Sequence, residues 1–239
     1  MTATVEVEQI ARDGLALARE LEAGPASVET IARVVLRWAG EQFGAGLVLL
    51  SSMGDGTLVH LASEVMPGIN VAFIDTGYHF GETLLTRDAV AASRPINLIN
   101  ISPVQTVAAQ DVQFGERLYE RDPGQCCNLR KVEPLDRALA GHHAWISGLR
   151  RDDAPTRADI GYIEFDAIRD MVKINPLAGW TQADVAAYDA REGVIANPLR
   201  EFDYTSIGCA PCTRPIAPGE DLRAGRWSGL NKTECGLHT

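Results

Sequence analysis

Residues Gly46-Leu-Val-Leu-Leu-Ser-Ser52 form a short, continuous apolar run that ends in two serines. Such a run is typical of a strand that is buried on both faces of a parallel sheet. A second run of this kind, Asn70-Val-Ala-Phe-Ile-Asp75, follows residues 57–65, whose apolar positions have helical spacing. The order strand, helix, strand predicts a right-handed crossover between two parallel strands.

The alternation of helices and strands continues along most of the chain. A helix is predicted over residues 80–92, and Thr181 with Asp184 three residues later predicts the start of a helix that ends near Arg191. The further strand candidates are Ile96–Ile101, Ala144–Ser147, Met171–Asn175 and, with a less regular pattern, Tyr162–Phe165. This pattern predicts an α/β fold with a doubly wound, mostly parallel sheet.

The chain divides into three expected segments. Residues 1–43 contain two amphipathic helices, the second capped by Ser27, that are expected to pack on the main domain. Residues 44–204 are expected to form the α/β domain. Residues 205–239 are expected to form a loop-rich C-terminal segment, because prolines and glycines accumulate there and periodicity fades.

The composition is that of an ordinary acidic globular protein. The 239 residues include 22 Lys and Arg against 32 Asp and Glu, a formal net charge of −10. This charge disfavours nucleic acid and an anionic membrane surface as partners, whereas a local cluster of arginines can still bind a small anionic substrate. The first residues do not resemble a signal peptide, and the apolar runs are too short to span a membrane. We therefore expect a cytoplasmic protein whose cysteines stay reduced.

Polar residues and glycines follow three of the predicted strands, in Ser51-Ser-Met-Gly-Asp-Gly56, Asp75-Thr-Gly77 and Ser147-Gly-Leu-Arg150. The requirements of a turn explain each stretch alone, but the carboxyl ends of parallel strands share one edge, where such sheets bind ligands. The first stretch is no Walker A loop because it lacks the Lys-Ser/Thr ending. Its amides and hydroxyls can nevertheless hold a phosphate at a helix N-terminus.

Four of the five cysteines form two close pairs, Cys126-Cys127 and Cys209-Ala-Pro-Cys212. Four thiolates brought together can hold zinc or an iron–sulfur cluster. Directly adjacent cysteines make a poor zinc knuckle, so the spacing favours a cluster over zinc. Redox-active or incidental thiols are a third interpretation, although the second pair lies in a proline-rich loop rather than on a helix after an early strand.

The fifth cysteine, Cys235, lies near the C-terminus with Lys232, Glu234 and His238 close by in the sequence. These neighbours can activate its thiol as a nucleophile, and the alternative is an incidental exposed cysteine. If Cys235 is a nucleophile, the pairing of the other four leaves no cysteine to resolve a covalent adduct on its sulfur. An external thiol donor would then have to complete the reaction.

Six arginines lie in two loop segments, one after the strand at residues 144–147 and one after the second cysteine pair. Solvated side chains are the default interpretation of each. Their density on a chain of net charge −10 nevertheless indicates local recognition of phosphate or sulfate. The six are Arg150, Arg151, Arg157, Arg214, Arg223 and Arg226.

Together these motifs resemble the iron–sulfur adenylyl-sulfate (APS) reductases of sulfate assimilation, from about residue 45 to the C-terminus. Besides the segments at Asp75–Gly77 and Ser147–Arg151, the matching stretches are Cys126-Cys127, Arg130-Lys131-Val-Glu-Pro-Leu135, Ile207-Gly-Cys-Ala-Pro-Cys-Thr-Arg-Pro215, Gly219-Glu-Asp-Leu-Arg-Ala-Gly-Arg-Trp227 and Lys232-Thr-Glu-Cys-Gly-Leu-His238.

The resemblance implies an adenine-nucleotide α-hydrolase-like fold and a 4Fe–4S cluster on Cys126, Cys127, Cys209 and Cys212. It also implies that the Cys235 thiolate attacks the sulfate sulfur of APS, that AMP leaves, and that thioredoxin releases sulfite from the resulting S-sulfocysteine, a step toward cysteine. The substrate-binding residues that it implies are Ser51, Ser52, Gly54, Asp55, Asp75, Gly77, Lys131, Gly148, Arg157, Arg223, Arg226 and His238.

Other functions stay open beside this one. A reductase of the 3′-phosphorylated substrate PAPS is the nearest, but that branch lacks the four paired cysteines, although one enzyme can use both substrates. A zinc-stabilised nucleotide-binding module would leave Cys235 incidental. An ATP pyrophosphatase needs Ser-Gly-Gly-x-Asp-Ser, which Ser51–Gly56 does not spell. The sequence is compatible with a homo-oligomer.

Overall fold

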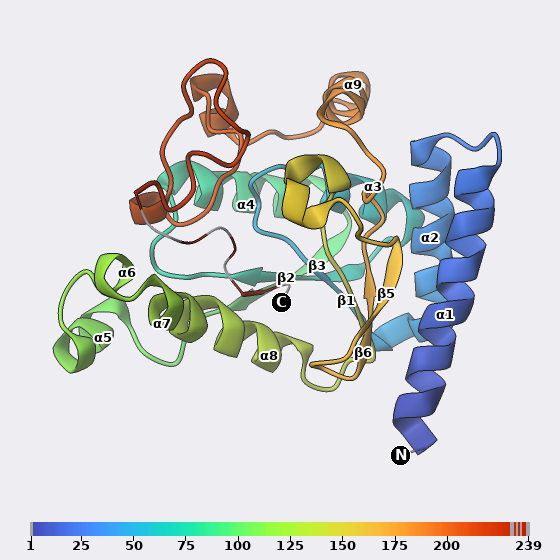
Figure 1. Cartoon of the computed structure of the whole chain (residues 1–239), viewed down its shortest axis with the longest axis horizontal. Helices are drawn as coiled ribbons and strands as arrows, with labels where there is room; N and C mark the ends of the chain where they lie inside the picture. The colour runs from blue at the N-terminus through green and yellow to red at the C-terminus, as the bar shows by residue number, and fades with distance from the viewer. Residues whose placement is uncertain (1, 230–231, 233, 235, 238–239) are drawn as a thin grey trace.

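The computed structural model describes residues 2–229, 232, 234 and 236–237, so the predicted nucleophile Cys235 and the predicted substrate-binding residue His238 lie outside the described residues. In the described part, one sheet has the strand order β3-β2-β1-β4-β6-β5, parallel except for the β5–β6 pair (Figure 1). The strands are β1 (Leu47–Leu50), β2 (Ile69–Ile74), β3 (Ile96–Ile101), β4 (Ala144–Ile146), β5 (Ile163–Asp166) and β6 (Met171–Ile174). The predicted doubly wound, mostly parallel α/β fold is confirmed.

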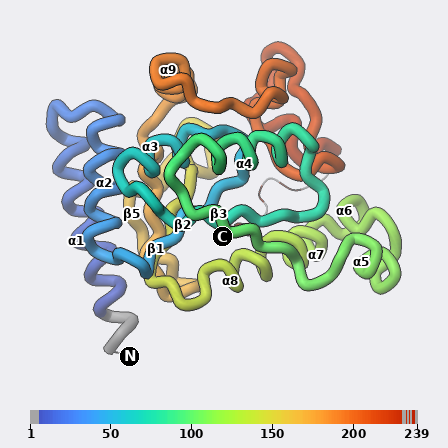
Figure 2. The backbone as a smooth tube through the Cα atoms, turned by 180° about the vertical axis from the view of Figure 1, so that it is seen from behind, coloured from blue at the N-terminus to red at the C-terminus, as the bar shows by residue number. Residues whose placement is uncertain are grey.

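Helices cover both faces of this sheet. They are α1 (Thr2–Ala23), α2 (Val28–Phe43), α3 (Thr57–Val65), α4 (Gly81–Ser93), α5 (Val107–Phe114), α6 (Leu118–Arg121), α7 (Pro123–Cys127), α8 (Glu133–Leu139) and α9 (Gln182–Glu192). Figures 1 and 2 show α3, α4 and α9 on one side of the sheet and α8, preceded by α5 to α7, on the other. Helix α1 packs on β5 and β6, and α2 packs on α1 and α3.

The central strands bury side chains on both faces. Along β1, Leu47 and Leu49 join one apolar cluster and Val48 joins another, because successive side chains of a strand point to opposite sides. The first cluster includes residues of α1, α2, α3 and α9, and the second includes Leu135 and Leu139 of α8. This double burial explains why these strands read as continuous apolar runs in the sequence.

The helix starts that were expected at Ser27 and Thr181 are confirmed. The Ser27 hydroxyl accepts a hydrogen bond from the Thr30 N–H at 3.1 Å, and Thr181 and Asp184 form a reciprocal capping box. Helices α1 and α2 approach closely at Gly14, where a Cβ would lie 2.6 Å from the Trp38 ring. Within the described residues, none of the helices has the length and apolar character needed to cross a membrane.

The segment between β3 and β4 was not predicted in detail. It contains α5, three shorter helices, α6 to α8, and a π-helical turn at Asn128–Val132. Helices of four to seven residues are too short to show a clear hydrophobic period. The pair Cys126-Cys127 ends α7, immediately before the π turn.

Acidification is expected to destabilise the fold partly through His60 of α3. Burial lowers the pKa of His60, whose Nδ1 lies 2.9 Å from the Tyr188 hydroxyl. The neutral ring is therefore favoured in the folded state, and stability falls as pH drops from about 6.5, the unfolded value, toward the lower folded value. We expect the melting temperature to fall less between about pH 7.5 and about pH 5.5 in His60→Gln than in the wild type, as measured by thermal unfolding. Equal losses would contradict this.

Candidate active site

A cavity of about 240 Å³ opens at the carboxyl ends of β1, β2 and β4. Strand β1 lies between β2 and β4, and the chain runs from β1 outward to β2 and β3 before returning to β4 on the other side. The cavity therefore occupies the topological switch point, where doubly wound sheets bind their ligands. After these strands its lining residues are Ser51, Ser52, Gly54 and Asp55, then Thr76 and His79, then Ser147, Gly148, Leu149 and Arg150.

The structure brings most of the predicted substrate-binding residues to this cavity. Those in the lining are Ser51, Ser52, Gly54, Asp55, Lys131, Gly148, Arg157, Arg223 and Arg226. Asp75 and Gly77 are absent from the lining, and Thr76 lies there between them. The Asp75 carboxylate accepts a hydrogen bond from the Gly77 N–H at 3.0 Å, which closes a local turn and directs the carboxylate away from the cavity.

The loop after β1 is held in an unusual backbone conformation. Met53 is fully buried with a φ of 53°, in the left-handed region, and its N–H donates to the Ser51 hydroxyl at 3.2 Å. Asn197 donates to the Met53 carbonyl at 3.2 Å from the segment after α9. Two elements therefore fix this turn, and it leaves Ser52 and Gly54 on the cavity side just before α3 begins. A loop of this kind at a helix N-terminus suits a phosphate.

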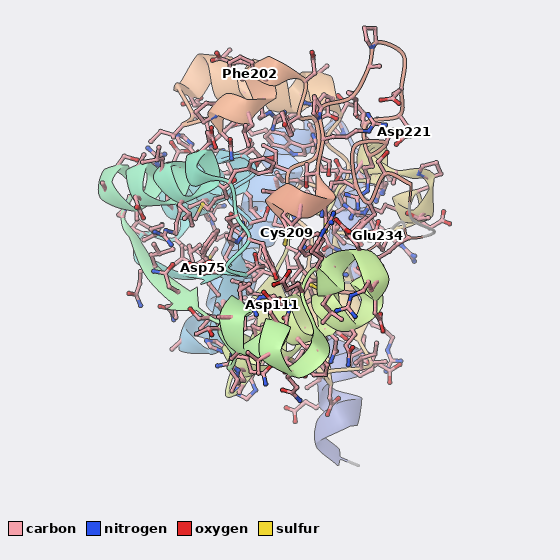
Figure 3. All side chains as sticks on the ribbon, turned by 90° about the vertical axis from the view of Figure 1, so that its left-hand side faces the viewer. Asp75, Asp111, Phe202, Cys209, Asp221 and Glu234 are labelled. Atoms are coloured by element: carbon pink, nitrogen blue, oxygen red, sulfur yellow. The ribbon has the colours of Figure 1, made fainter. Side chains whose placement is uncertain are left out.

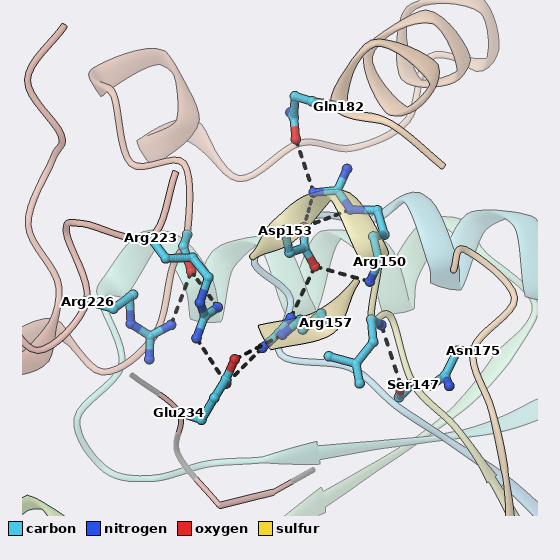
Figure 4. A network of polar contacts seen from close by, with 11 residues as sticks. Ser147, Arg150, Asp153, Arg157, Asn175, Gln182, Arg223, Arg226 and Glu234 are labelled. Atoms are coloured by element: carbon cyan, nitrogen blue, oxygen red, sulfur yellow. Dashed lines mark hydrogen bonds and ion pairs between the residues drawn. The ribbon is translucent and has the colours of Figure 1, made fainter. Parts of the chain in front are cut away.

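A network of arginines and carboxylates forms one wall of the cavity (Figure 4). Arg150 donates through Nη2 to Asp153 at 2.6 Å, and Arg157 donates through Nη1 to the same carboxylate at 3.1 Å. The remaining Arg157 donors, Nε and Nη2, bind the Glu234 carboxylate at 3.0 and 2.9 Å. Arg223 donates to Glu234 at 3.1 Å and to the Ser206 hydroxyl at 3.3 Å. The wall is therefore largely organised by its own ion pairs.

Glu234 carries its charge inside this network. Burial alone would raise the pKa of its carboxyl, but the hydrogen bonds and charges of Arg157, with the charges of Arg223 and Arg226, hold that pKa below its ordinary value. In Figure 3, Glu234 and Cys209 lie near the centre of the molecule, whereas Phe202 and Asp221 lie at its rim. A residue of the C-terminal tail thus supplies an anion to the cavity.

Arg226 and Arg150 both line the cavity, and each has one buried guanidinium nitrogen without a hydrogen-bond partner among the described residues. The Arg226 guanidinium stacks on Trp227, with 4.5 Å between the guanidinium carbon and the ring centroid, and its Nη1 reaches Ser206 at a long 3.5 Å. Its Nε is buried and has no hydrogen-bond partner among the described residues. Among the described residues, Arg150 forms an ion pair with Asp153 and no ion pair of Arg226 is found, so the Arg226 guanidinium is a candidate for binding a substrate anion.

The four paired cysteines line a second, smaller pocket beside the cavity. Cys126 and Cys127 come from the end of α7, and Cys209 and Cys212 flank the short 3₁₀ turn at Ala210–Cys212. Burial, with the charges of the other three cysteines, raises the pKa of Cys126 to about 12, so the four sulfurs lie close enough to interact. Within the described residues, no three His, Cys, Asp or Glu side chains converge as ligands of a single ion.

Arg130 ties the first cysteine pair to the sheet. From the π turn its Nη1 donates to Gln110 of α5 at 3.1 Å, and its Nε donates to the Thr76 carbonyl after β2. The Thr76 hydroxyl in turn lies 3.4 Å from the Cys209 sulfur. The extra residue of the π turn lets Arg130 face the sheet while Lys131 faces the cavity, and π turns recur at functional sites.

The cavity and the cysteine pocket share a wall. Lys131, Cys209 and Trp227 line both spaces. Trp227 is buried in the left-handed backbone region, with a φ of 47°, and its N–H donates to the Cys212 carbonyl at 3.0 Å. Its ring is also approached by Lys131 and Lys232, at 6.0 and 5.8 Å from the centroid. Charge placed in one space is therefore felt in the other.

The sequence did not predict Asp153, Ser206 or Trp227 as site residues, and it indicated Glu234 only as a neighbour of the predicted nucleophile Cys235. Asp153 stands in an ordinary Arg-Asp-Asp run, and Ser206 stands in an ordinary loop before the cysteine pair. Neither position carries a local pattern. The tail motif did contain a usable signal, since Glu234 directly precedes the predicted nucleophile Cys235.

Comparison with known proteins identifies the family. Residues 46–215 match the phosphoadenosine phosphosulfate reductase domain. The chain belongs to this family. It is 51% identical over 238 residues to the adenosine 5′-phosphosulfate reductase of Streptomyces coelicolor, covering 100% of both chains. It is also 51% identical over 222 residues to the enzyme of that name from Mycolicibacterium smegmatis, covering 92% of this chain and 94% of the relative. The resemblance seen in the cysteine pairs and the tail is confirmed.

Solved structures of other members and of more distant proteins agree with this fold. The phosphoadenylyl-sulfate reductase of Candida auris, in a phosphate complex, is 29% identical with a TM-score of 0.66, covering 77% of this chain and 90% of that one. The FMN adenylyltransferase of Candida glabrata, 13% identical with a TM-score of 0.57 over 88% of this chain and 74% of that one, shares the fold. These likenesses support the mostly parallel α/β fold described above.

Proposed function

We propose that this chain reduces adenosine 5′-phosphosulfate to sulfite and AMP, in the assimilation of sulfate toward cysteine. The observation that carries the proposal is the basic cavity at the switch point, which shares a wall with four clustered thiols and receives Glu234 of the tail. The names of relatives that are 51% identical support APS as the substrate, whereas the PAPS reductase is 29% identical.

The cavity suits a nucleotide that carries phosphate and sulfate groups. Ser52 and Gly54 lie where a phosphate can meet the start of α3, and Arg226 contributes its guanidinium to the same lining. Lys131 and Arg223 add positive charge in the same lining. These cations would offset the negative charge that builds on the leaving phosphate during sulfuryl transfer.

The proposed reaction balances as three successive displacements at sulfur. The Cys235 thiolate attacks the sulfate sulfur, the bond from sulfur to the bridging oxygen breaks, and AMP leaves with the electron pair, giving S-sulfocysteine. A thiolate of reduced thioredoxin then attacks the Cys235 sulfur and expels sulfite. The second thiol of thioredoxin closes its disulfide and restores the Cys235 thiolate, so the dithiol supplies both electrons.

We propose a 4Fe–4S cluster on Cys126, Cys127, Cys209 and Cys212. The donor set fits, because two thiols from the end of α7 and two from the segment around Ala210–Cys212 line one small pocket, where burial and the neighbouring thiols raise the pKa of Cys126 and Cys212. When bound, the cluster would supply a fixed charge distribution next to Lys131, on the wall that it shares with the substrate cavity. The thiol chemistry and thioredoxin also favour a cytoplasmic location.

Mass spectrometry tests the proposed function. The protein is mixed with APS in the absence of thioredoxin and other reductants, and the cysteine-containing peptides are analysed. We expect an adduct with the mass of SO₃ on the peptide that carries Cys235, together with one equivalent of AMP. Release of AMP without an adduct, or an adduct on another cysteine, would overturn the assignment.

Arg226 is expected to bind the substrate anion. Arg226→Met keeps a side chain that packs on Trp227 and removes the charge-assisted hydrogen bonds, which should raise the dissociation constant for APS by roughly 10- to 100-fold. Arg214→Ala is the matched control, because Arg214 belongs to the same segment but pairs with Glu220 outside the cavity. Equal affinities of the two variants for APS, measured by calorimetry, would show that Arg226 does not bind the substrate.

A further inference from the structure

We propose that Glu234 is a positioning residue that holds the C-terminal tail in the cavity, so that Cys235 reacts with bound substrate. The inference rests on the proposed function, because it takes Cys235 as the nucleophile. Glu234 is the residue directly before Cys235, and its side chain enters the wall of the substrate cavity. The contacts of the described residues carry the inference.

The Glu234 carboxylate is bound from two sides. Both of its oxygens accept from Arg157, at 3.0 and 2.9 Å, in a two-pronged arrangement, and Oε2 also accepts from Arg223 at 3.1 Å (Figure 4). All three side chains are largely buried, with 12%, 15% and 19% exposure for Arg157, Arg223 and Glu234. Buried, bidentate pairs of this kind hold geometry far better than exposed ion pairs.

The two arginines that receive Glu234 are themselves fixed. Arg157 donates through Nη1 to Asp153, whose carboxylate also binds Arg150. Arg223 donates to the Ser206 hydroxyl. Arg157 therefore directs Nε, Nη1 and Nη2 at carboxylates of the protein. These contacts indicate that Arg157 binds the tail rather than a substrate anion.

A second, apolar contact holds the tail on the other side of Cys235. Leu237 lines the cavity and packs against the apolar cluster that includes Ile74 and Leu135. Lys232 lies over Trp227 before the acidic residue. The described tail residues on both sides of Cys235 thus contact the cavity, and Glu234 supplies the charged contact.

Holding the tail has a direct kinetic consequence. A nucleophile must come within about 3–3.5 Å of the atom that it attacks, and loss of that alignment slows the chemical step even when the substrate is bound. Removing the Glu234 charge should therefore lower the rate of S-sulfocysteine formation at saturating APS. We expect the affinity for APS to stay unchanged, because the contacts of Glu234 among the described residues are with Arg157 and Arg223.

The test compares Glu234→Gln with Glu220→Gln in the iron-loaded, full-length protein. Glu220 is a matched control, since it is also bound bidentately by an arginine, Arg214, in the same C-terminal segment but outside the cavity. Single-turnover mixing with APS, followed by mass spectrometry of the Cys235 peptide, gives the adduct rate. Calorimetry gives the dissociation constant for APS, and thermal unfolding shows whether each variant is folded.

We expect Glu234→Gln to form the adduct roughly 10- to 100-fold more slowly at saturating APS, with an unchanged dissociation constant, and Glu220→Gln to match the wild type. Adduct formation at the wild-type rate in Glu234→Gln would overturn the positioning role. Tighter APS binding in that variant would also overturn it, because Glu234 would then be an anion that competes with substrate. An absent adduct in the wild type would instead refute Cys235 as the nucleophile.

Discussion

Replacing Cys235 by serine is expected to abolish sulfite release, lowering turnover by at least about 10³-fold, while the affinity for APS stays unchanged. The hydroxyl of serine is a far weaker nucleophile than a thiolate at neutral pH, so neither the S-sulfo adduct nor AMP should form. The measurement is sulfite production with thioredoxin and an excess of APS, beside APS binding by calorimetry.

The serine variant also has an internal control. Because Cys235 is outside the set of four paired cysteines, Cys235→Ser should retain the full iron content and the absorbance of the wild type. Retained turnover in Cys235→Ser would refute the proposed role of Cys235 as the nucleophile. Loss of iron together with activity would show that Cys235 belongs to the metal site instead.

Replacing Cys209 by serine is expected to remove the iron as well as the activity. Cys209 lines both the cysteine pocket and the substrate cavity, and a 4Fe–4S cluster needs each of its four thiolates. Iron should fall from about four atoms per chain to well below that number, with loss of the brown colour. Metal analysis measures the iron content, and absorbance at about 400 nm, a range typical of such clusters, measures the colour.

Iron content and absorbance measured for serine variants of all five cysteines distinguish the proposed cluster ligands from the proposed nucleophile. Serine variants of Cys126, Cys127 and Cys212 should behave like Cys209→Ser, and Cys235→Ser should not. A colourless wild-type protein with about one zinc per chain would contradict the cluster and support a zinc site. Full iron content in Cys209→Ser, with a thermal unfolding profile like that of the wild type, would exclude Cys209 as a ligand.

Much of the scaffold could be predicted from local pattern. The runs at Gly46–Ser52 and Asn70–Asp75 are β1 and β2 in the structure, since a strand covered on both faces must be apolar at every position. The capped helix at Thr181 followed from a hydrogen-bonding pattern that spans four residues. The short elements between residues 118 and 139 could not be predicted in the same way, because tertiary contacts such as those of Arg130 determine them.

The sequence by itself predicted the doubly wound fold and the family, which are confirmed, because local periodicity and short motifs carry both. The four-plus-one division of the cysteines follows from their spacing and stays a prediction. Only the tertiary structure decided which residues meet. It placed Thr76 rather than Asp75 at the cavity, committed the donors of Arg157 to carboxylates, and brought Glu234 to two distant arginines. Partners separated by 77 residues, as Arg157 and Glu234 are, leave no local pattern, since the fold alone sets the geometry of a buried ion pair.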